Sequence, residues 1–320
     1  MLRGNRVRYL ATARANLDLT WRSPEVIGGA AAWLDGVGAD VVVADHEPFV
    51  ARAAARAGVP VVALSHQLVL TEARPRAPLR HALSAWGTRV GIGVLAPPAD
   101  AAVVPSFFFP PPRPGSTAVF VPPILRDDVL AAPADAPSGR GGPSGRGGPS
   151  GRGGRVLVYV NEGAGMGPLL GALGAVDAAF DVYGLEGGPA PANVRLRPPS
   201  RPGFVADLAA ARAVVATAGF TLLSEALHLG VPVLAVPNRG FFEQTVNALA
   251  LRDLGRGEAV LDRPLRPSDV AGFLGRADAY RRPAQTAARG RAGRERAADV
   301  VERVLGAPRP ARRRAGRAPA

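Results

Sequence analysis

The sequence of 320 residues contains no cysteine and no lysine. Without cysteine the chain can form no disulfide, thiolate nucleophile or cysteine metal site. Without lysine it has neither the phosphate-binding lysine of a P-loop nor a lysine able to form a Schiff base. All 39 basic side chains are therefore arginines, a bias typical of a GC-rich genome, so their number alone says little about function.

Other sequence patterns are also missing. No apolar run reaches the roughly 18 residues of a membrane-spanning helix, and the first residues lack the apolar core of a signal peptide. We therefore expect a cytoplasmic protein. There is no G-x-S-x-G elbow of an α/β-hydrolase. The four histidines, His46, His66, His81 and His228, lack the spacing of a metal site, so no metal is expected.

The net charge of +13 suggests a nucleic-acid or membrane partner, but its distribution argues against nucleic acid. Eight of the thirteen excess positive charges lie in two segments without acidic residues, 137–154 and 307–320. The chain also shows no interleaving of aromatic and basic residues that would stack bases. We expect no nucleic-acid partner. Loose attraction of the tail to an anionic membrane remains open. These eight residues are Arg140, Arg146, Arg152, Arg309, Arg312, Arg313, Arg314 and Arg317.

Composition divides the chain into two α/β domains and two segments of low complexity. Residues 137–154 are three copies of Pro-Ser-Gly-Arg-Gly-Gly, which has no apolar side chain to bury and reads as a flexible linker. An RNA- or phosphate-binding role for these repeats is the less favoured alternative. We expect an N-terminal domain over residues 1–130, a linker over 131–154, a second domain over 155–306 and a basic tail over 307–320.

The first domain shows β-branched runs typical of buried parallel strands. Strands are expected at Val7–Ala11, Ala39–Asp45, Val59–Leu64 and Ala118–Val121, and helices at Phe49–Gly58 and Arg76–Val90. Two of the strands deliver polar residues to their carboxyl ends, where α/β sites gather. These residues are Asp45, Glu47 and His66, and each is a candidate general base.

The second domain continues the alternation of strands and helices that predicts a parallel sheet. Strands are expected at Arg155–Val160, Phe180–Tyr183, Val194–Leu196 and Ala213–Ala216, and again from Val231. One helix is expected after the loop that ends at Gly167, running to about Ala179, and another after Gly219. Further helices are expected over Val205–Ala211, Phe241–Leu254, Pro267–Leu274 and Tyr280–Leu305.

A glycine-rich loop, Gly163-x-Gly165-x-Gly167, follows the first strand of this domain. A dinucleotide fingerprint needs G-x-G-x-x-G, and here the third glycine comes one residue early. An acid about twenty residues on exists, Asp181 or Glu186, but Asp181 starts a strand rather than ending one. An NAD or FAD site is therefore disfavoured, and the alternatives are a phosphate-adjacent loop or a turn needed only for side-chain packing.

The stretch from Ala213 to Pro237 reads as strand, turn, helix and strand. A helix that begins just after a strand points unpaired backbone N–H groups and its positive dipole end above the sheet, which suits a phosphate. Here these groups belong to Gly219, Phe220 and Thr221. Glu225 lies one turn further on, within reach of a ribose diol attached to that phosphate.

Within the run from Gly219 to Leu249, six residues fall in the register of a known pattern: Glu225, Gly230, Pro232, Pro237, Gln244 and Asn247. The segment resembles the donor-binding segment of GT-B glycosyltransferases, which include the lipid-II N-acetylglucosaminyltransferase and the UDP-glucuronosyltransferases. The resemblance implies two Rossmann-like domains facing across a cleft. It covers the second domain nearly whole, while the first lacks the family's opening G-x-G-H loop and is expected to be incomplete.

The resemblance also implies a reaction. A hexose-type sugar would pass from a nucleotide-diphospho-sugar, most simply a UDP-sugar, to a small-molecule, lipid or glycan acceptor, with inversion and without a metal. Gly163, Gly219, Phe220, Thr221, Glu225, Gln244 and Asn247 would contact the donor, Arg239 the leaving diphosphate, and Asp45, Glu47 or His66 would act as base. A non-catalytic sugar-nucleotide-binding protein and a UDP-sugar epimerase are the alternatives.

Overall fold

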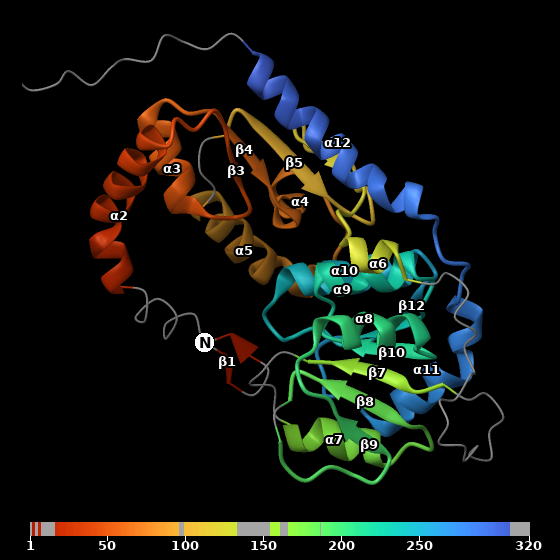
Figure 1. The fold of residues 1–320 in the computed structure, drawn as a ribbon. Coiled ribbons are helices and arrows are strands. Elements are labelled where there is room, and N and C mark those ends of the chain that lie inside the picture. Colours follow the sequence, from red (N-terminus) through yellow and green to blue (C-terminus); the bar gives the residue numbers. More distant parts are fainter. Residues whose placement is uncertain are drawn as a thin grey trace, which may run out of the picture. The chain divides into compact units, whose positions relative to one another are not determined.

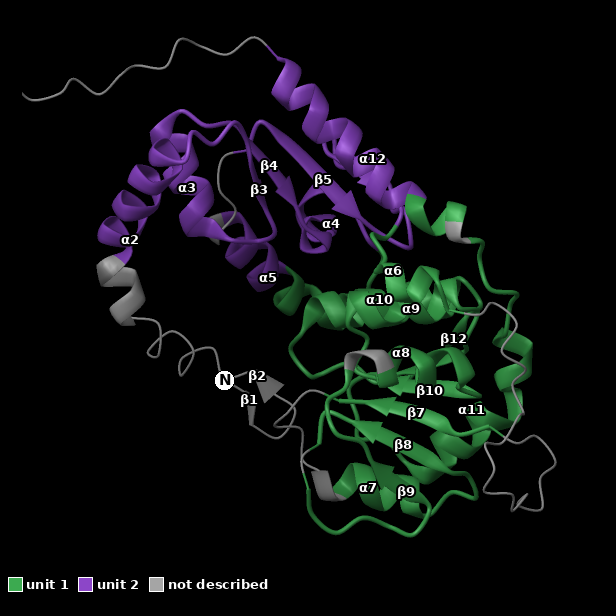
Figure 2. Ribbon diagram, viewed as in Figure 1, with its two compact units in different colours: residues 1–9, 76–85, 123–291 green, residues 10–75, 86–122, 292–320 purple. Residues whose placement is uncertain are grey.

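The computed structural model describes residues 2–3, 6–7, 17–95, 99–132, 154–160, 166–185 and 187–307. The chain forms two compact units, coloured separately in Figure 2. Unit 1 comprises residues 1–9, 76–85 and 123–291, and unit 2 comprises residues 10–75, 86–122 and 292–320. Most of the expected linker and nearly all of the expected tail lie outside the described residues.

Unit 1 is built on a six-stranded parallel sheet with the order β12-β11-β10-β7-β8-β9 (Figure 1). The chain starts in the middle of the sheet, runs outward to one edge, and then returns to the middle before running to the other edge. The strand order therefore reverses between β7 and β10, which pair directly. In open α/β sheets ligands bind outside the carboxyl ends of the strands at such a point. The strands are β7 (Val156–Tyr159), β8 (Phe180–Tyr183), β9 (Val194–Leu196), β10 (Ala213–Ala216), β11 (Val233–Ala235) and β12 (Gly257–Ala259).

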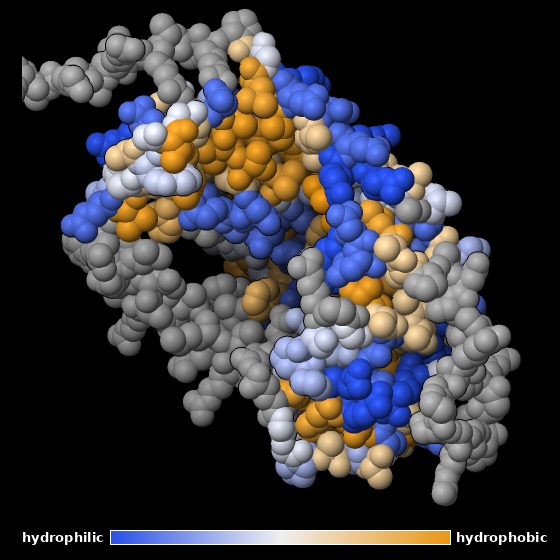
Figure 3. Space-filling view, in the orientation of Figure 1, coloured by the Kyte–Doolittle hydropathy of each residue, from blue (hydrophilic) through white to orange (hydrophobic). Residues whose placement is uncertain are grey.

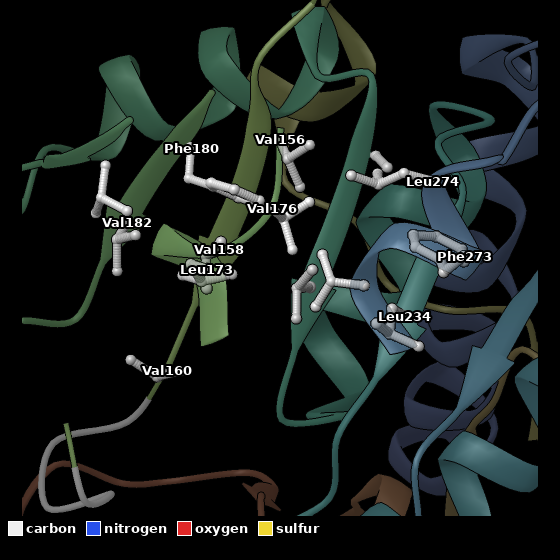
Figure 4. Packing of buried hydrophobic residues seen from close by; sticks show 14 of the residues in the cluster. Val156, Val158, Val160, Leu173, Val176, Phe180, Val182, Leu234, Phe273 and Leu274 are labelled. Atoms are coloured by element: carbon white, nitrogen blue, oxygen red, sulfur yellow. The ribbon is translucent and has the colours of Figure 1, made fainter. Parts of the chain in front are cut away.

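Helices cover both faces of this sheet because alternate strand residues point to opposite sides. On one face Val156, Val158 and Phe180 pack with Leu173 of α7 and Phe273 of α11, as Figure 4 shows. Burying an apolar side chain of this size contributes about 1.5–3 kcal/mol, so this layer is a main source of the unit's stability. The helices of unit 1 are α6 (Asp127–Leu130), α7 (Met166–Gly174), α8 (Arg201–Ala210), α9 (Phe220–His228), α10 (Phe242–Asp253) and α11 (Pro267–Tyr280).

Unit 2 carries a four-stranded parallel sheet with the order β3-β4-β5-β6. Alanines allow two of its helices to lie close together: Ala51 and Ala54 of α3 are fully buried, and Ala30 and Ala31 of α2 pack against the same core. The strands are β3 (Val42–Ala44), β4 (Val61–Leu64), β5 (Ala101–Pro105) and β6 (Val119–Val121), and the helices are α2 (Leu17–Gly36), α3 (Pro48–Ala57), α4 (Val69–Glu72) and the 3-10 turn η1 (His66–Leu68).

The remaining elements join the units or stand outside the sheets. β1 (Leu2–Arg3) and β2 (Arg6–Val7) form a short antiparallel pair. The 3-10 turn η2 (Leu79–His81) leads into α5 (Ala82–Leu95), and α12 (Ala287–Gly306) follows α11. Hydrophilic side chains cover the outward side of α12 in Figure 3. Among the described helices, none is both long and apolar enough to cross a bilayer.

The observed elements differ from the expected ones in a few places. Residues 17–36, for which the sequence predicted no element, form the long helix α2, whose alanines and glycines carry little periodic signal. A single helix over Tyr280–Leu305 was wrong: residues 281–286 separate α11 from α12, and Pro283 cannot donate a helical hydrogen bond. The strand β12 was not expected, since Gly257–Ala259 has no apolar run.

Candidate donor site and its relatives

The carboxyl end of β10 leads into α9 through Thr217, Ala218 and Gly219. Ala218 has a φ of 63°, a conformation that residues with a side chain rarely adopt. The first hydrogen bond of α9 runs from Leu223 N to Gly219 O. The amides of Thr221 and Leu222 therefore have no acceptor within the helix. The expected turn between strand and helix is thus present, and β10 lies beside β7 at the point where the strand order reverses.

Two buried amide side chains on α10 hold the loops at this edge of the sheet. Asn247, which is fully buried, donates from Nδ2 to Ala218 O at 3.2 Å, and so supports the turn in its unusual conformation. Gln244 accepts from the backbone N of Asn238 through Oε1 at 2.8 Å. Both side chains were expected to contact the donor. In the structure each is hydrogen-bonded to the backbone of a nearby loop.

Glu225 has a partner that the sequence did not indicate. Its carboxylate is only 2% exposed, and it accepts from Arg126 Nε at 2.8 Å and from Arg126 Nη2 at 3.0 Å. The pairing raises the pKa of the Arg126 guanidinium, with the hydrogen bond to Glu225 as the largest cause. The carboxylate expected to bind a ribose is therefore oriented by two hydrogen bonds from an arginine 99 positions earlier in the chain.

Three further residues were considered for ligand binding in the sequence: Gly163 and Arg239 for the donor, and Asp181 for a dinucleotide. Gly163 lies outside the described residues. Arg239 donates from Nη2 to Asp262 O at 2.8 Å, which ties its side chain to the loop after β12. Asp181 forms ion pairs with Arg155 and Arg195 near the start of β8, away from the carboxyl ends of the strands, so it does not serve as the acid of a dinucleotide site.

In unit 2, the three candidate bases follow two adjacent parallel strands, β3 and β4. Asp45 is exposed just after β3. Glu47 is the N-cap of α3, and its Oε2 accepts from Val50 N at 2.7 Å. A capping carboxylate that gave up this bond would destabilise its helix by about 1 kcal/mol. Glu47 therefore has a structural role that its position in the sequence did not reveal.

His66 is buried at the end of β4 and has a defined orientation. Its Nδ1 lies 2.7 Å from Pro105 O. A carbonyl oxygen can only accept, so Nδ1 carries the proton of the neutral ring and Nε2 is the basic nitrogen. The ring stacks on Phe107 at 6.3 Å between centroids and meets Phe108 edge-on at 6.0 Å. This arrangement holds the imidazole in the tautomer that a base requires.

Most of the sequence matches the model of a known protein family. A family model described as glycosyl transferase family 1 matches residues 1–277. The chain belongs to this family. It is a glycosyltransferase, and its two α/β units with parallel sheets are the two Rossmann-like units of a GT-B fold, as expected from the segment around Glu225. No curated protein sequence matches the chain.

Solved structures of glycosyltransferases share the fold of this glycosyltransferase. The calicheamicin glycosyltransferase CalG4 is 23% identical with a TM-score of 0.58, over 95% of this chain and 83% of that one. MurG of Acinetobacter baumannii is 15% identical with a TM-score of 0.54, over 89% and 79%. The spinosyn forosaminyltransferase SpnP is 19% identical with a TM-score of 0.56, over 88% and 80%.

Proposed function

We propose that this glycosyltransferase binds a nucleotide-diphospho-sugar outside the carboxyl ends of β7 and β10 and transfers its sugar to an acceptor hydroxyl. The observation that carries the proposal is the coincidence of two features at one place in unit 1. The strand order reverses between these two strands. The turn after β10 also begins α9 with amides that lack an acceptor within the helix.

In this proposal the diphosphate lies against the backbone of Gly219, Phe220 and Thr221 and is stabilised by the positive end of the α9 dipole. Gly163, which lies outside the described residues, is proposed from the sequence alone to contact the donor as well. Glu225 accepts the ribose hydroxyls. Gln244 and Asn247 contact the sugar or phosphate while holding their loops. Backbone N–H groups stabilise the leaving diphosphate, so no metal ion is needed for that step.

The reaction is proposed to invert the anomeric carbon. The acceptor oxygen forms a bond to that carbon as the bond to the diphosphate breaks, and the diphosphate leaves with the electron pair. A base removes the acceptor proton. Of the three candidates we propose His66, because its Nδ1 is already engaged as a donor, while Glu47 caps a helix. The leaving diphosphate thus carries the electron pair, and Nε2 of His66 carries the proton of the acceptor hydroxyl.

The proposed nucleotide is UDP, on the resemblance of the segment from Gly219 to Asn247 to enzymes that use UDP-sugars. One structural relative, the glycosyltransferase VinC, was solved in complex with dTDP; it is 19% identical with a TM-score of 0.51, over 87% of this chain and 75% of that one. A thymidine nucleotide is therefore the first alternative, and both belong in the same binding experiment.

The test is a calorimetric titration of the full chain with UDP, dTDP, ADP and GDP, repeated with Glu225→Ala. We expect binding of one nucleotide, weakened at least tenfold in the variant. Glu258→Ala is the matched control, because Glu258 is also held by an arginine in two hydrogen bonds, from Arg276, but lies on β12. Equal affinities of wild type and Glu225→Ala would overturn the role given to Glu225. A folded wild-type chain that binds none of the four would overturn the donor site.

A further inference from the structure

Four arginines gather at the edge of the unit 1 sheet where β10, β11 and β12 begin, which is the edge opposite the proposed donor site (Figure 1). Arg212 directly precedes β10, and Arg256 directly precedes β12. Arg281 and Arg282 follow α11, and the backbone N of Arg282 donates to Gly230 O, just before β11, at 3.3 Å. The segment after α11 therefore lies against the first residues of these strands.

Backbone carbonyl oxygens hold all four guanidinium groups in place. Within the described residues, these hydrogen bonds engage only one nitrogen of each guanidinium, which has five N–H groups in all. Each side chain is therefore positioned and still has donors for a further acceptor. The bonds are Arg212 Nη2 to Leu274 O at 3.1 Å, Arg256 Nη2 to Leu227 O at 3.0 Å, Arg281 Nη2 to Ala211 O at 3.3 Å and Arg212 O at 2.6 Å, and Arg282 Nη1 to Ala279 O at 2.9 Å and Arg281 O at 2.8 Å.

Carboxylates do not balance these four charges in the part of the chain that the structure describes. Elsewhere on the same edge they do: Asp181 forms ion pairs with Arg155 at 2.7 Å and with Arg195 at 2.6 Å. None of the four arginines forms such a pair with a described residue. Arginine stays protonated in proteins, so the positive charge is permanent. The carbonyls at helix ends compensate it only in part, since a helix terminus carries about half a unit charge.

Like charges also crowd two of these side chains. Burial lowers the pKa of the Arg256 guanidinium, and the nearby Arg282 lowers it further. Burial likewise lowers the pKa of Arg281, an effect that Asp278 opposes and Arg212 strengthens. The Nε of Arg256 is buried and has no hydrogen-bond partner among the described residues. An anion beside these groups would relieve the repulsion between them.

We propose that Arg212, Arg256, Arg281 and Arg282 form a second phosphate site, which binds a soluble oligophosphate. A guanidinium matches two oxygens of a phosphate, and linked phosphates place several negative charges in a small volume. The first residues of β10 and β12 lie two strand spacings apart, about 10 Å, so a chain of two or three phosphates suits the site better than a single one. About 13 Å of strand separates this edge from the turn at Gly219, so the site is distinct from the donor site and independent of the proposed function.

The experiment is a calorimetric titration of the full chain with inorganic tripolyphosphate. We expect at least tenfold weaker binding in Arg256→Gln/Arg282→Gln, because two charge-assisted hydrogen-bond donors are removed. Arg282→Gln alone should weaken binding severalfold, and this exposed substitution provides the test if the double variant does not fold. Arg263→Gln/Arg276→Gln is the matched control, because it removes the same charge from side chains of unit 1 that are held in ion pairs. It should bind as the wild type does.

Three results would overturn the proposal. The first is a folded wild type that does not bind tripolyphosphate. The second is equal affinity of the wild type and Arg256→Gln/Arg282→Gln, and displacement by UDP would then assign the binding to the donor turn. The third is an equal loss of affinity in the control, which would show that only the net charge matters. A lipid headgroup is tested with vesicles that contain phosphatidic acid: flotation that requires Arg256 and Arg282, without binding of tripolyphosphate, would assign the edge to a membrane in place of a soluble ligand.

Discussion

Arg126 and Glu225 form an ion pair with two hydrogen bonds, of 2.8 and 3.0 Å, between the segment before α6 and the buried side of α9. Glu225 is almost completely buried, and the guanidinium of Arg126 lies directly against its carboxylate. Removing one member of a buried pair commonly costs about 3 kcal/mol or more, because the other charge is left without compensation.

We therefore expect Arg126→Met to lower the free energy of unfolding by about 3 kcal/mol, and Arg126→Met/Glu225→Leu to be more stable than Arg126→Met. Urea unfolding measures both. The control is Arg276→Met, which breaks the exposed pair with Glu258 and should have little effect. A double variant that is less stable than Arg126→Met by the full effect of Glu225→Leu would show that the two residues are not coupled.

Asn247 supports the turn at Ala218 by a hydrogen bond to a buried carbonyl. Asn247→Leu leaves that carbonyl unsatisfied, at a cost of about 1–3 kcal/mol, and frees the turn from its conformation. We expect lower stability together with at least tenfold weaker nucleotide binding, measured by unfolding and by calorimetry.

Asn193 offers a matched control for this variant. Asn193 lies just before β9, an edge strand of the sheet. Its Nδ2 donates to the backbone carbonyls of Leu173, Val176 and Ala178. Asn193→Leu should lower stability by a similar or larger amount and leave nucleotide affinity unchanged. Equal loss of affinity in both variants would mean that Asn247 acts only on stability.

His66 can be changed without losing its hydrogen bond to Pro105 O. In His66→Asn the side-chain amide occupies the place of Nδ1 and can still donate, but the basic nitrogen is gone. We expect the turnover number to fall by about 100- to 10,000-fold while the Michaelis constant for the donor stays constant. The measurement is steady-state kinetics with an acceptor that the wild-type enzyme glycosylates. His46→Asn is the control, since His46 also follows a strand of unit 2 and its φ of 49° suits asparagine. Turnover reduced equally by both substitutions would argue against His66 as the base.

Gly230 lies between α9 and β11 with a φ of 74°, and a Cβ at this position would come within 2.0 Å of Arg282 O. Gly230→Ala therefore combines backbone strain with a clash against main-chain atoms. We expect a loss of more than about 2 kcal/mol, measured by urea unfolding. Gly255→Ala separates the two causes, because Gly255 has a φ of 62° but open space around its Cβ. It should lose about 1 kcal/mol. Equal losses in the two variants would show that the contact with Arg282 does not matter.

His228 is buried on α9, and burial lowers the pKa of its imidazole below the usual 6.5. Between that value and the lower pKa of the folded state, the unfolded chain binds more protons than the folded chain, so folding stability is lost as the pH falls below about 6.5. We expect the thermal midpoint of the wild type to drop more between about pH 7 and pH 5 than that of His228→Leu. Parallel pH profiles of the two proteins would rule out this contribution.

Several parts of the fold followed from local patterns. The strands Phe180–Tyr183, Val194–Leu196 and Ala213–Ala216 were predicted with their observed bounds, because short runs that contain Val, Phe or Tyr and are bounded by turn residues favour strands. The family was predicted from residues 225 to 247, since the pattern there is local and dense. The helix α2 and the strand β12 escaped prediction because their side chains show no clear period.

The candidate site divides in the same way. The sequence by itself determined the α/β class, the turn at Gly219 and the helix after it, because these depend on neighbouring residues. Only the tertiary structure decided that Arg126 pairs with Glu225, that Asn247 holds Ala218, and that Pro105 orients His66. These contacts join residues 99, 29 and 39 positions apart. They depend on which strands lie side by side, and no local periodicity encodes that order.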